Sequence, residues 1–329
     1  MKEALLRIDD LNVTFGSRFG NRPKVRAVTS LSLEVAPGET LAIVGESGSG
    51  KSVTALSILR LIPEPGRIES GSILFEGRNL LALDDAGVRS VRGNRIAMIF
   101  QEPMSSLNPV LTIGRQVAEP LRLHRRLKRR EALEQAVDLL RSVAIPDAEK
   151  RLGDYPHQFS GGMRQRVMIA MALACHPRLL IADEPTTALD VTVQAQILEL
   201  LKERTRETDS ALILITHDLG VVARYADRVA VMYGGRIVES GPAAALYADP
   251  LHPYTQGLLR SVPRLEGDCG GRLDSIDGQP PDLAALPAGC AFAPRCPHTR
   301  DRCHEAPPPL ESAAGGRARA CYGYEEGVA

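Results

Sequence analysis

The sequence has no excess charge of either sign and no long apolar run. Lys plus Arg and Asp plus Glu both number 40, so no net basic field is present to hold a nucleic-acid backbone. The strongest apolar runs, such as residues 211–216, fall far short of the roughly 18 residues that suggest a membrane-spanning helix. The first ten residues lack the charged and apolar regions of a signal peptide. We therefore expect a cytosolic chain whose main partner is not nucleic acid.

Cysteine is scarce but clustered. Of the 6 cysteines, most lie close to the end of the chain, after residue 289. Disulfides are rare in a reducing compartment, so such a cluster indicates a metal site. Cys175 stands apart in a helix-like segment and is expected to be an inert buried thiol, and Cys269 in a glycine-rich stretch is expected to have no role.

Strand and helix patterns alternate along most of the 329 residues, a length that fits one α/β core with a smaller appended unit. Short apolar runs are typical of strands buried on both faces of a parallel sheet. A helix is expected over 52–61. The segment 111–144 is expected to be helical with Leu133, Val137, Leu140 and Ala144 on one face. The remaining strand-like segments are 5–15, 29–36, 40–44 and 70–80.

A glycine-rich segment, GESGSGKS at residues 45–52, fits the phosphate-loop pattern G-x-x-x-x-G-K-[ST]. It follows an apolar strand and precedes a helix, as the pattern requires. Its backbone N–H groups would surround phosphate oxygens, and the helix N-terminus would add positive potential. We expect Lys51 to neutralise the β- and γ-phosphates and Ser52 to hold Mg²⁺. A glycine-rich turn without a ligand is the alternative interpretation.

Two carboxylates follow an apolar strand in RLLIADEP, residues 178–185. Such a strand delivers Asp183 to the carboxyl edge of the sheet, where ligands of open α/β sheets bind. Asp183 can position Mg²⁺, and Glu184 can orient and deprotonate an attacking water. The pattern therefore predicts ATP hydrolysis in addition to binding, although a surface turn that opens a helix is the alternative.

The segment SGGMRQR at residues 160–166, which we call the signature segment, indicates which class of ATP-hydrolysing protein this is. The chain resembles the ATP-binding subunits of ABC transporters, in which a signature of this form lies between the phosphate loop and the aspartate strand. Gln101 in MIFQEP, Asp190 in TTALD and His217 in LITHD match further motifs in the same order. The resemblance covers nearly the whole chain.

This resemblance implies a fold and a division of the chain. The fold class is α/β, a P-loop NTPase with an ABC-type RecA-like core, an antiparallel β subdomain, a helical insert and a small loop-rich C-terminal extension. The ATPase domain would span residues 1–241, with the insert at about 103–165, and the extension would span 242–329.

The resemblance also implies roles for the matching residues. Glu184, His217 and Lys51 would be catalytic, and Ser52, Gln101 and Asp183 would bind Mg²⁺. Phe15 resembles the aromatic residue that stacks on adenine, although a core role is the alternative. The residues expected to bind ATP are Phe15, Gly45, Glu46, Ser47, Gly48, Ser49, Gly50, Lys51, Ser52, Val53, Gln101, Asp183, Ser160, Gly161, Gly162, Gln165 and Asp190.

The extension resembles that of a narrower group. LHPYTQGLLRSVP at 251–263, followed by GCAFAPRCPHTRDRC at 289–303, is similar to the C-terminal extension of ABC ATPases from dipeptide, oligopeptide and nickel importers. Some dipeptide-type members carry a [4Fe–4S] cluster there, which implies such a cluster on Cys290, Cys296, Cys303 and Cys321. Spacing alone leaves iron–sulfur, zinc and redox thiols open. Zinc, with His298 or His304, is the main alternative.

The resemblance finally implies partners. The chain would lie on the cytoplasmic face of a bacterial membrane, paired with a second ATPase chain or with itself beneath two transmembrane permease subunits. These would receive peptide from an extracytoplasmic binding protein. Alternatives are a soluble ABC ATPase acting on nucleic acid or ribosomes, a nickel or glutathione importer subunit, and a sensor whose cluster gates hydrolysis.

Overall fold

The computed structural model describes residues 3–16, 24–101, 106–186, 189–261 and 276–323. The chain forms two compact units. Unit 1 comprises Met1–Leu5, Val35–Thr40 and Ala82–Ile215, and unit 2 comprises Leu6–Glu34, Leu41–Leu81 and Thr216–Ala329. The phosphate loop therefore belongs to unit 2, whereas the acidic strand and the signature segment belong to unit 1.

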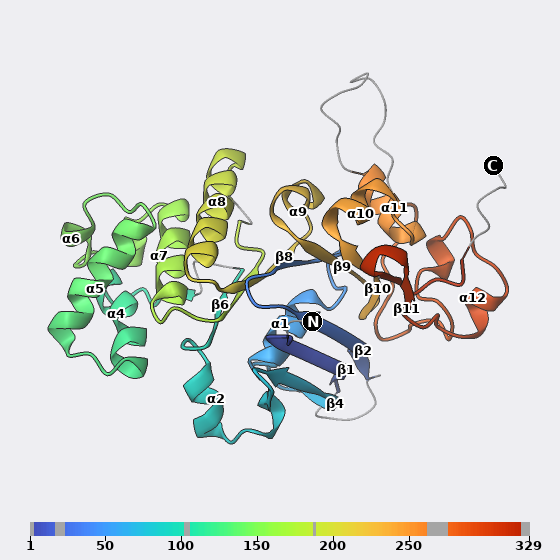
Figure 1. The fold of residues 1–329 in the computed structure, drawn as a ribbon, viewed down its shortest axis with the longest axis horizontal. Coiled ribbons are helices and arrows are strands. Elements are labelled where there is room, and N and C mark those ends of the chain that lie inside the picture. Colours follow the sequence, from blue (N-terminus) through green and yellow to red (C-terminus); the bar gives the residue numbers. More distant parts are fainter. Residues whose placement is uncertain (1–2, 17–23, 102–105, 187–188, 262–275, 324–329) are drawn as a thin grey trace. The chain divides into compact units, whose positions relative to one another are not determined.

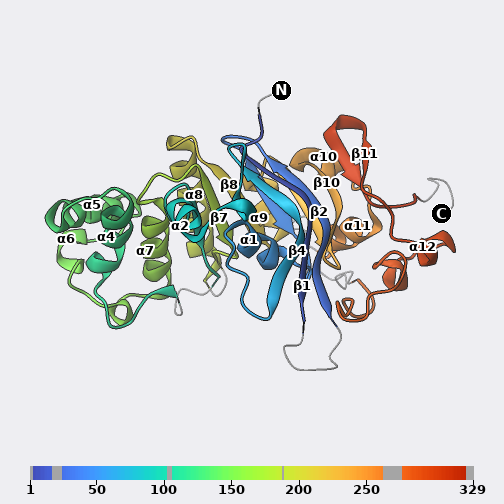
Figure 2. The ribbon, with the colours of Figure 1, turned by 90° about the horizontal axis from the view of Figure 1, so that it is seen from below.

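Unit 2 contains a sheet of order β2-β1-β4-β5. Its strands are β1 (Leu6–Phe15), β2 (Val25–Val35), β4 (Gly66–Phe75) and β5 (Arg78–Asn79). Strands β1 and β4 run antiparallel from the Leu6–Phe75 pair to the Phe15–Gly66 pair. They lie side by side in both views (Figures 1 and 2). Buried and exposed side chains alternate along much of β2, as expected when one face of a sheet is covered. The predicted antiparallel β subdomain is confirmed.

A second sheet of unit 2 carries the phosphate loop. Every residue of β3 (Thr40–Val44) is buried, and this strand runs parallel to β9 (Arg228–Tyr233). Strand β10 (Arg236–Pro242) pairs antiparallel with β9. Two strands of the extension follow, β12 (Arg317–Arg319) beside β10 and β11 (Glu311–Ala313) beside β12. The extension thus adds strands to the part of the sheet that presents the phosphate loop.

The core of unit 2 joins these strands to the extension. Buried residues of β3 and β9, including Val44 and Tyr233, pack with Tyr254 and Phe292 of the extension. The helices of this unit are α1 (Lys51–Ile58), η1 (Leu80–Ala82), α9 (Leu219–Tyr225), α10 (Ala243–Ala248), α11 (Pro253–Arg260), η3 (Ala293–Arg295), α12 (Arg302–Glu305) and η4 (Ala314–Gly316). Helices α10 and α11 depart from the expected loop-rich extension, whereas the short elements after residue 276 agree with it.

Unit 1 contains three parallel strands in the order β8-β7-β6. These are β6 (Ile96–Ile99), β7 (Leu179–Asp183) and β8 (Ala211–Thr216), and β7 and β8 are buried along their whole length. The prediction of buried parallel strands is confirmed. Helices α2 (Asp85–Val91) and α8 (Val191–Glu207) also belong to this unit.

The helical insert of unit 1 consists of α4 (Ile113–His124), α5 (Arg129–Ser142), α6 (Ala148–Arg151), η2 (Pro156–Gln158) and α7 (Gly161–Leu173). Helices α4, α5 and α7 contact one another, as Figures 1 and 2 show. The predicted apolar face of α5 is confirmed at Val137 and Leu140, which are buried. It is wrong at Ala144, which is exposed because α5 has ended and the backbone there has a φ of +57°.

Among the described residues, no helix is both long and apolar enough to cross a membrane.

Candidate nucleotide-binding site

The phosphate loop connects β3 to α1, as predicted. Lys51 begins α1, and its side chain is buried, with 5% of the residue exposed. Its Nζ donates to the carbonyl oxygens of Gly45, at 2.7 Å, and Glu46, at 2.9 Å. The lysine is therefore held against the loop whose phosphate ligand it is expected to neutralise.

The phosphate loop packs closely against neighbouring backbone, and this explains why glycine is needed at two of its positions. A Cβ atom at Gly45 would lie 2.2 Å from the carbonyl oxygen of Met232. A Cβ atom at Gly50, where φ is +101°, would lie 2.5 Å from the carbonyl oxygen of Ala27. Real Cβ atoms do not approach backbone so closely, so both positions require glycine.

The acidic strand of unit 1 ends at Asp183, which is 5% exposed. The next residue, Glu184, donates its N–H to the carbonyl oxygen of Ile215 at 2.9 Å. One carboxylate oxygen of Glu184 accepts a hydrogen bond of 3.0 Å from Nε2 of Gln101. The structure thus brings together two residues that the motifs predicted to share a site. The segment after Gln101, residues 102–105, lies outside the described residues.

The signature segment opens helix α7. Ser160 is its N-cap, and the Ser160 Oγ accepts a hydrogen bond from the N–H of Met163 at 3.4 Å. A Cβ atom at Gly162 would lie 2.9 Å from a methyl carbon of Val193, so the helix start lies close to α8. Gln165 is 1% exposed, and its Nε2 has no hydrogen-bond partner within the described parts of the chain. An uncovered helix N-terminus of this kind suits an anion.

Three further predicted residues occupy the ends of regular elements. Asp190 caps α8, where its Oδ1 accepts from the N–H of Val193 at 2.9 Å. His217 follows β8 and is exposed. Phe15 ends β1 and is half-buried, and its ring lies against Gly66, because a Cβ atom there would fall 2.5 Å from the ring. The adjoining residues 17–23 lie outside the description. The roles of all three remain predictions.

Two features define a P-loop ATPase. One is a glycine-rich loop between a buried strand and a helix that begins with lysine, and the other is a buried aspartate at the end of a parallel strand. Residues 28–187 match the family described as ABC transporter, and residues 238–303 match the family described as oligopeptide/dipeptide transporter, C-terminal region.

Similar proteins agree with this class. The oligopeptide transport ATP-binding protein OppD of Salmonella typhimurium is 54% identical, over 97% of this chain and 93% of that one. The protein AppD of Bacillus subtilis, with the same description, is 50% identical over 98% and 97%. A dimeric ATP-binding cassette, MJ0796, solved in a post-hydrolysis state with ADP and Pi, superposes with a TM-score of 0.65 at 28% identity, over 72% of this chain and 98% of that one.

The chain therefore belongs to the ATP-binding subunits of ABC transporters, in the group that carries the oligopeptide and dipeptide C-terminal region. It is an ATPase, and its nucleotide is ATP with Mg²⁺. The predicted family, fold class and activity are confirmed.

The four predicted cluster ligands line one small cavity of about 20 Å³, which we call the cysteine pocket; they are Cys290, Cys296, Cys303 and Cys321. His252 and His298 also line this cavity. These thiols form no disulfide. In the described ranges, no group of three or more His, Cys, Asp or Glu side chains is arranged as a metal site in this structure, so neither iron–sulfur nor zinc is shown.

Burial governs the chemistry of these thiols. Burial raises the pKa of Cys296 to about 11 and also raises the pKa of Cys290 and Cys321, with smaller contributions from the neighbouring thiols. A ligand that binds here must therefore displace protons from thiols that hold them tightly. Cys175 is buried with a raised pKa, which agrees with an inert thiol. Cys269 lies outside the described residues.

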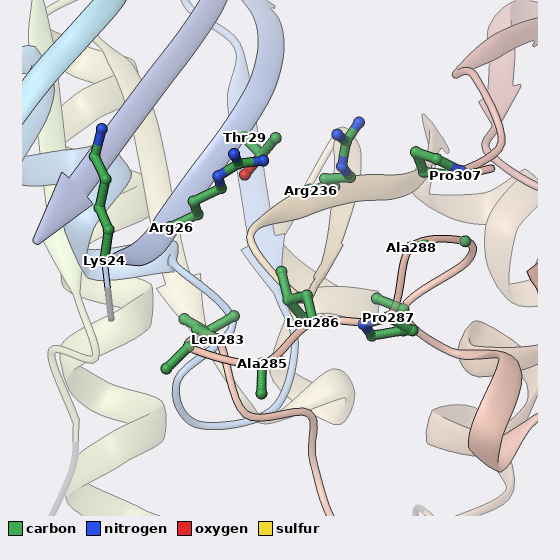
Figure 3. A pocket seen from close by; sticks show the side chains of 14 residues that line it. Lys24, Arg26, Thr29, Arg236, Leu283, Ala285, Leu286, Pro287, Ala288 and Pro307 are labelled. Atoms are coloured by element: carbon green, nitrogen blue, oxygen red, sulfur yellow. The ribbon is translucent and has the colours of Figure 1, made fainter. Parts of the chain in front are cut away.

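A second cavity of unit 2, of about 430 Å³, was not predicted from the sequence. Figure 3 shows the extension loop, with Leu283, Leu286 and Pro287, lying opposite Arg26 of β2 and Arg236 of β10. Burial and the nearby charge of Arg26 lower the pKa of Arg236. The extension loop and strands β2 and β10 therefore line one cavity within unit 2.

One contact of the phosphate loop was also missed. The carboxylate of Glu46 forms an ion pair with Arg295, from the segment between two of the clustered cysteines. The sequence contains one signal, a carboxylate in a loop that is expected to bind phosphates. Such a carboxylate needs a cation beside it, because its negative charge would otherwise repel the phosphates. Which of the chain's many arginines supplies it could not be read from spacing.

Proposed function

We propose that this chain is the ATP-hydrolysing subunit of an importer of oligopeptides or dipeptides. The observation that carries this proposal is the extension. Residues 238–303 match the oligopeptide/dipeptide C-terminal region, and this region forms part of the same unit as the phosphate loop. The relatives named as oligopeptide transport proteins support the same substrate class. No finding supports a soluble ATPase acting on nucleic acid or ribosomes, or nickel or glutathione as the substrate.

In the proposed reaction, the phosphate loop binds the β- and γ-phosphates through its backbone N–H groups and Lys51. Glu184 accepts a proton from water as the water oxygen bonds to the γ-phosphorus and the bond to the β–γ bridging oxygen breaks, releasing ADP and phosphate. The hydrogen bond from Gln101 orients the Glu184 carboxylate. The site residues stay assigned as the motifs predicted.

The Mg²⁺ site fits the residues present, because a buried carboxylate and a hydroxyl are hard oxygen donors. Asp183, Ser52 and Gln101 would hold the ion, and the ion would neutralise phosphate charge. We assign the remaining loop residues, including Ser47, Gly48, Ser49 and Val53, to backbone contacts with the nucleotide.

The signature segment completes the site of a second subunit in this proposal. The capped N-terminus of α7, with Ser160, Gly161 and Gly162, would face the γ-phosphate bound by the partner. ATP would then stabilise a dimer, and hydrolysis would release it. The ATPase pair would lie beneath two permease subunits, which would receive peptide from an extracytoplasmic binding protein. The chain would lie on the cytoplasmic face of the membrane.

We further propose that the cysteine pocket binds a [4Fe–4S] cluster. What supports it is the convergence of Cys290, Cys296, Cys303 and Cys321 on one cavity; Cys175, the other cysteine in the described part of the chain, does not line it. The cluster would supply covalent links between loops that have little apolar core of their own. Anaerobic purification followed by iron, sulfide and zinc analysis tests it, with about four irons and four sulfides per chain expected. Stoichiometric zinc without sulfide would contradict it.

The importer assignment is tested by purification from native membrane and identification of the chains that accompany this one. We expect two permease subunits and an ATPase chain. Addition of the cognate binding protein loaded with peptide should stimulate ATP hydrolysis. Stimulation by nucleic acid, with no permease present, would contradict the proposal.

A further inference from the structure

Glu46, the second residue of the phosphate loop, is joined to the extension by both its side chain and its backbone. Its carboxylate accepts two hydrogen bonds from the Arg295 guanidinium, at 2.7 and 3.0 Å. Its N–H donates to the Tyr254 hydroxyl at 2.9 Å. Its carbonyl oxygen accepts from Lys51 Nζ at 2.9 Å. One residue therefore links the lysine that neutralises phosphate to two side chains of the extension.

The Arg295 side chain is held in place by contacts other than its ion pair with Glu46. Its side chain is only 5% exposed. Its Nε donates to the carbonyl oxygen of Asp277 at 2.9 Å, and Nη1 donates to the Tyr233 hydroxyl at 3.3 Å. A paired, parallel arrangement of guanidinium and carboxylate gives both strength and geometric specificity. The arginine thus holds the Glu46 carboxylate in one position and needs no rearrangement to do so.

Electrostatics explains why the pairing matters to the site. The phosphate loop must attract a polyanion, and a carboxylate in the same loop opposes this attraction over several ångströms at low effective dielectric. An unpaired Glu46 would also compete for Lys51. Because the Glu46 side chain is three-quarters buried, at 25% exposed, water screens it only in part.

We propose that Arg295 is a positioning residue for ATP binding, which neutralises and holds Glu46 so that the phosphate loop keeps its path and its positive potential. The inference rests on ATP binding at this loop. It makes the extension a requirement for nucleotide affinity, in addition to any role of the cysteine pocket.

The test is the affinity of the full-length chain for Mg·ATP, measured by calorimetry for wild type, R295Q, E46Q and the double variant E46Q/R295Q. We expect R295Q to bind about tenfold more weakly, because a carboxylate is left unpaired beside the phosphates. The double variant should bind within about threefold of E46Q, which is the reference for a loop without this carboxylate, since neither contains that charge. Recovery in the double variant distinguishes charge neutralisation from a simple loss of structure.

A matched control is R317Q, which removes another guanidinium from the extension. Arg317 pairs with Asp249 at 2.8 Å and also donates to the carbonyl oxygens of Asp249 and Ala314. Its loss should leave ATP affinity unchanged. R295K, which keeps the charge, should remain within about threefold of wild type and serves if R295Q does not fold.

Three results would overturn the inference. Unchanged affinity in R295Q would do so, as would a double variant as weak as R295Q. If R295Q does not fold, a tenfold loss in R295K would do so instead. A wild-type chain that fails to bind Mg·ATP would instead contradict the proposed function itself, so the two failures are distinguishable.

Discussion

Glu184 has a backbone φ of +44°, in the left-handed region that residues with a side chain rarely adopt. Such strain persists only where neighbours hold it, and it is commonest at functional sites. Here the N–H is held by Ile215 and the carboxylate by Gln101. The motif predicted the identity of the residue, but only the structure shows that its backbone and side chain are both fixed.

Replacing Glu184 with Gln should stop hydrolysis and preserve ATP binding. The amide has nearly the same shape but cannot accept the proton of the attacking water, so we expect kcat to fall by at least about 100-fold. Phosphate release and ATP affinity measure the two properties. The control is E134Q, on an exposed ion pair of α5, which should not change kcat. Rapid turnover by E184Q would show that another group acts as base.

His252 should make unit 2 sensitive to acid. The residue is 1% exposed, and burial lowers its pKa to about 4. Between pH 7 and pH 4, His252 takes up a proton in the unfolded chain but stays neutral in the folded chain. The free energy of unfolding therefore falls as the pH falls through the ordinary range of histidine. The full loss is about 3 kcal/mol at pH 4.

The matched variant is H252N, whose side-chain oxygen can still accept from the N–H of Tyr254, as His252 Nδ1 does at 3.0 Å. Urea unfolding at several pH values should show a shallower decline for H252N. Burial raises the pKa of the adjacent Glu239, but that carboxyl is common to both chains and cancels in the comparison. Parallel declines would mean that His252 is protonated in the folded state.

At the scale of elements, strand β3 and helix α1 were predicted nearly to the residue, because the phosphate-loop pattern fixes what flanks it. The segment 111–144, predicted to be helical, consists of two helices, α4 and α5. No Pro or Gly marks the break; Arg126 turns the chain there with a φ of +57°. The extension helices α10 and α11 were missed because they are short, with 6 and 8 residues, and they are buried against β9, β10 and their neighbours.

Two glycines of the phosphate loop should respond differently to a methyl group. Alanine is disfavoured at both positions by about 1–2 kcal/mol through backbone strain alone, because φ is +78° at Gly48 and +101° at Gly50. A Cβ at Gly50 also clashes with the carbonyl oxygen of Ala27, whereas no atom of the described residues lies within 4 Å of a Cβ at Gly48. We expect G50A to lose about 1–3 kcal/mol more than G48A in nucleotide-free unfolding. Equal losses would show that the loop relaxes away from Ala27.

At the scale of the whole molecule, motif order was sufficient to predict the family, the fold class and the activity. What the sequence could not predict is how the extension meets the phosphate loop. The Glu46–Arg295 pair joins residues that are far apart in the chain, and the convergence of four cysteines depends on turns such as that at Gly289, where a Cβ would lie 2.1 Å from the carbonyl oxygen of Cys303. Such contacts follow from tertiary packing and leave no periodic signal.

The most direct measurement of the central claim is peptide uptake by vesicles that contain the complete importer, with ATP supplied on the side of this chain. We predict uptake that consumes ATP with the wild-type chain. Both uptake and hydrolysis should be lost with Lys51→Ala, because the phosphates lose their cation. Peptide uptake that continues at the wild-type rate with Lys51→Ala in every ATPase subunit would contradict the account.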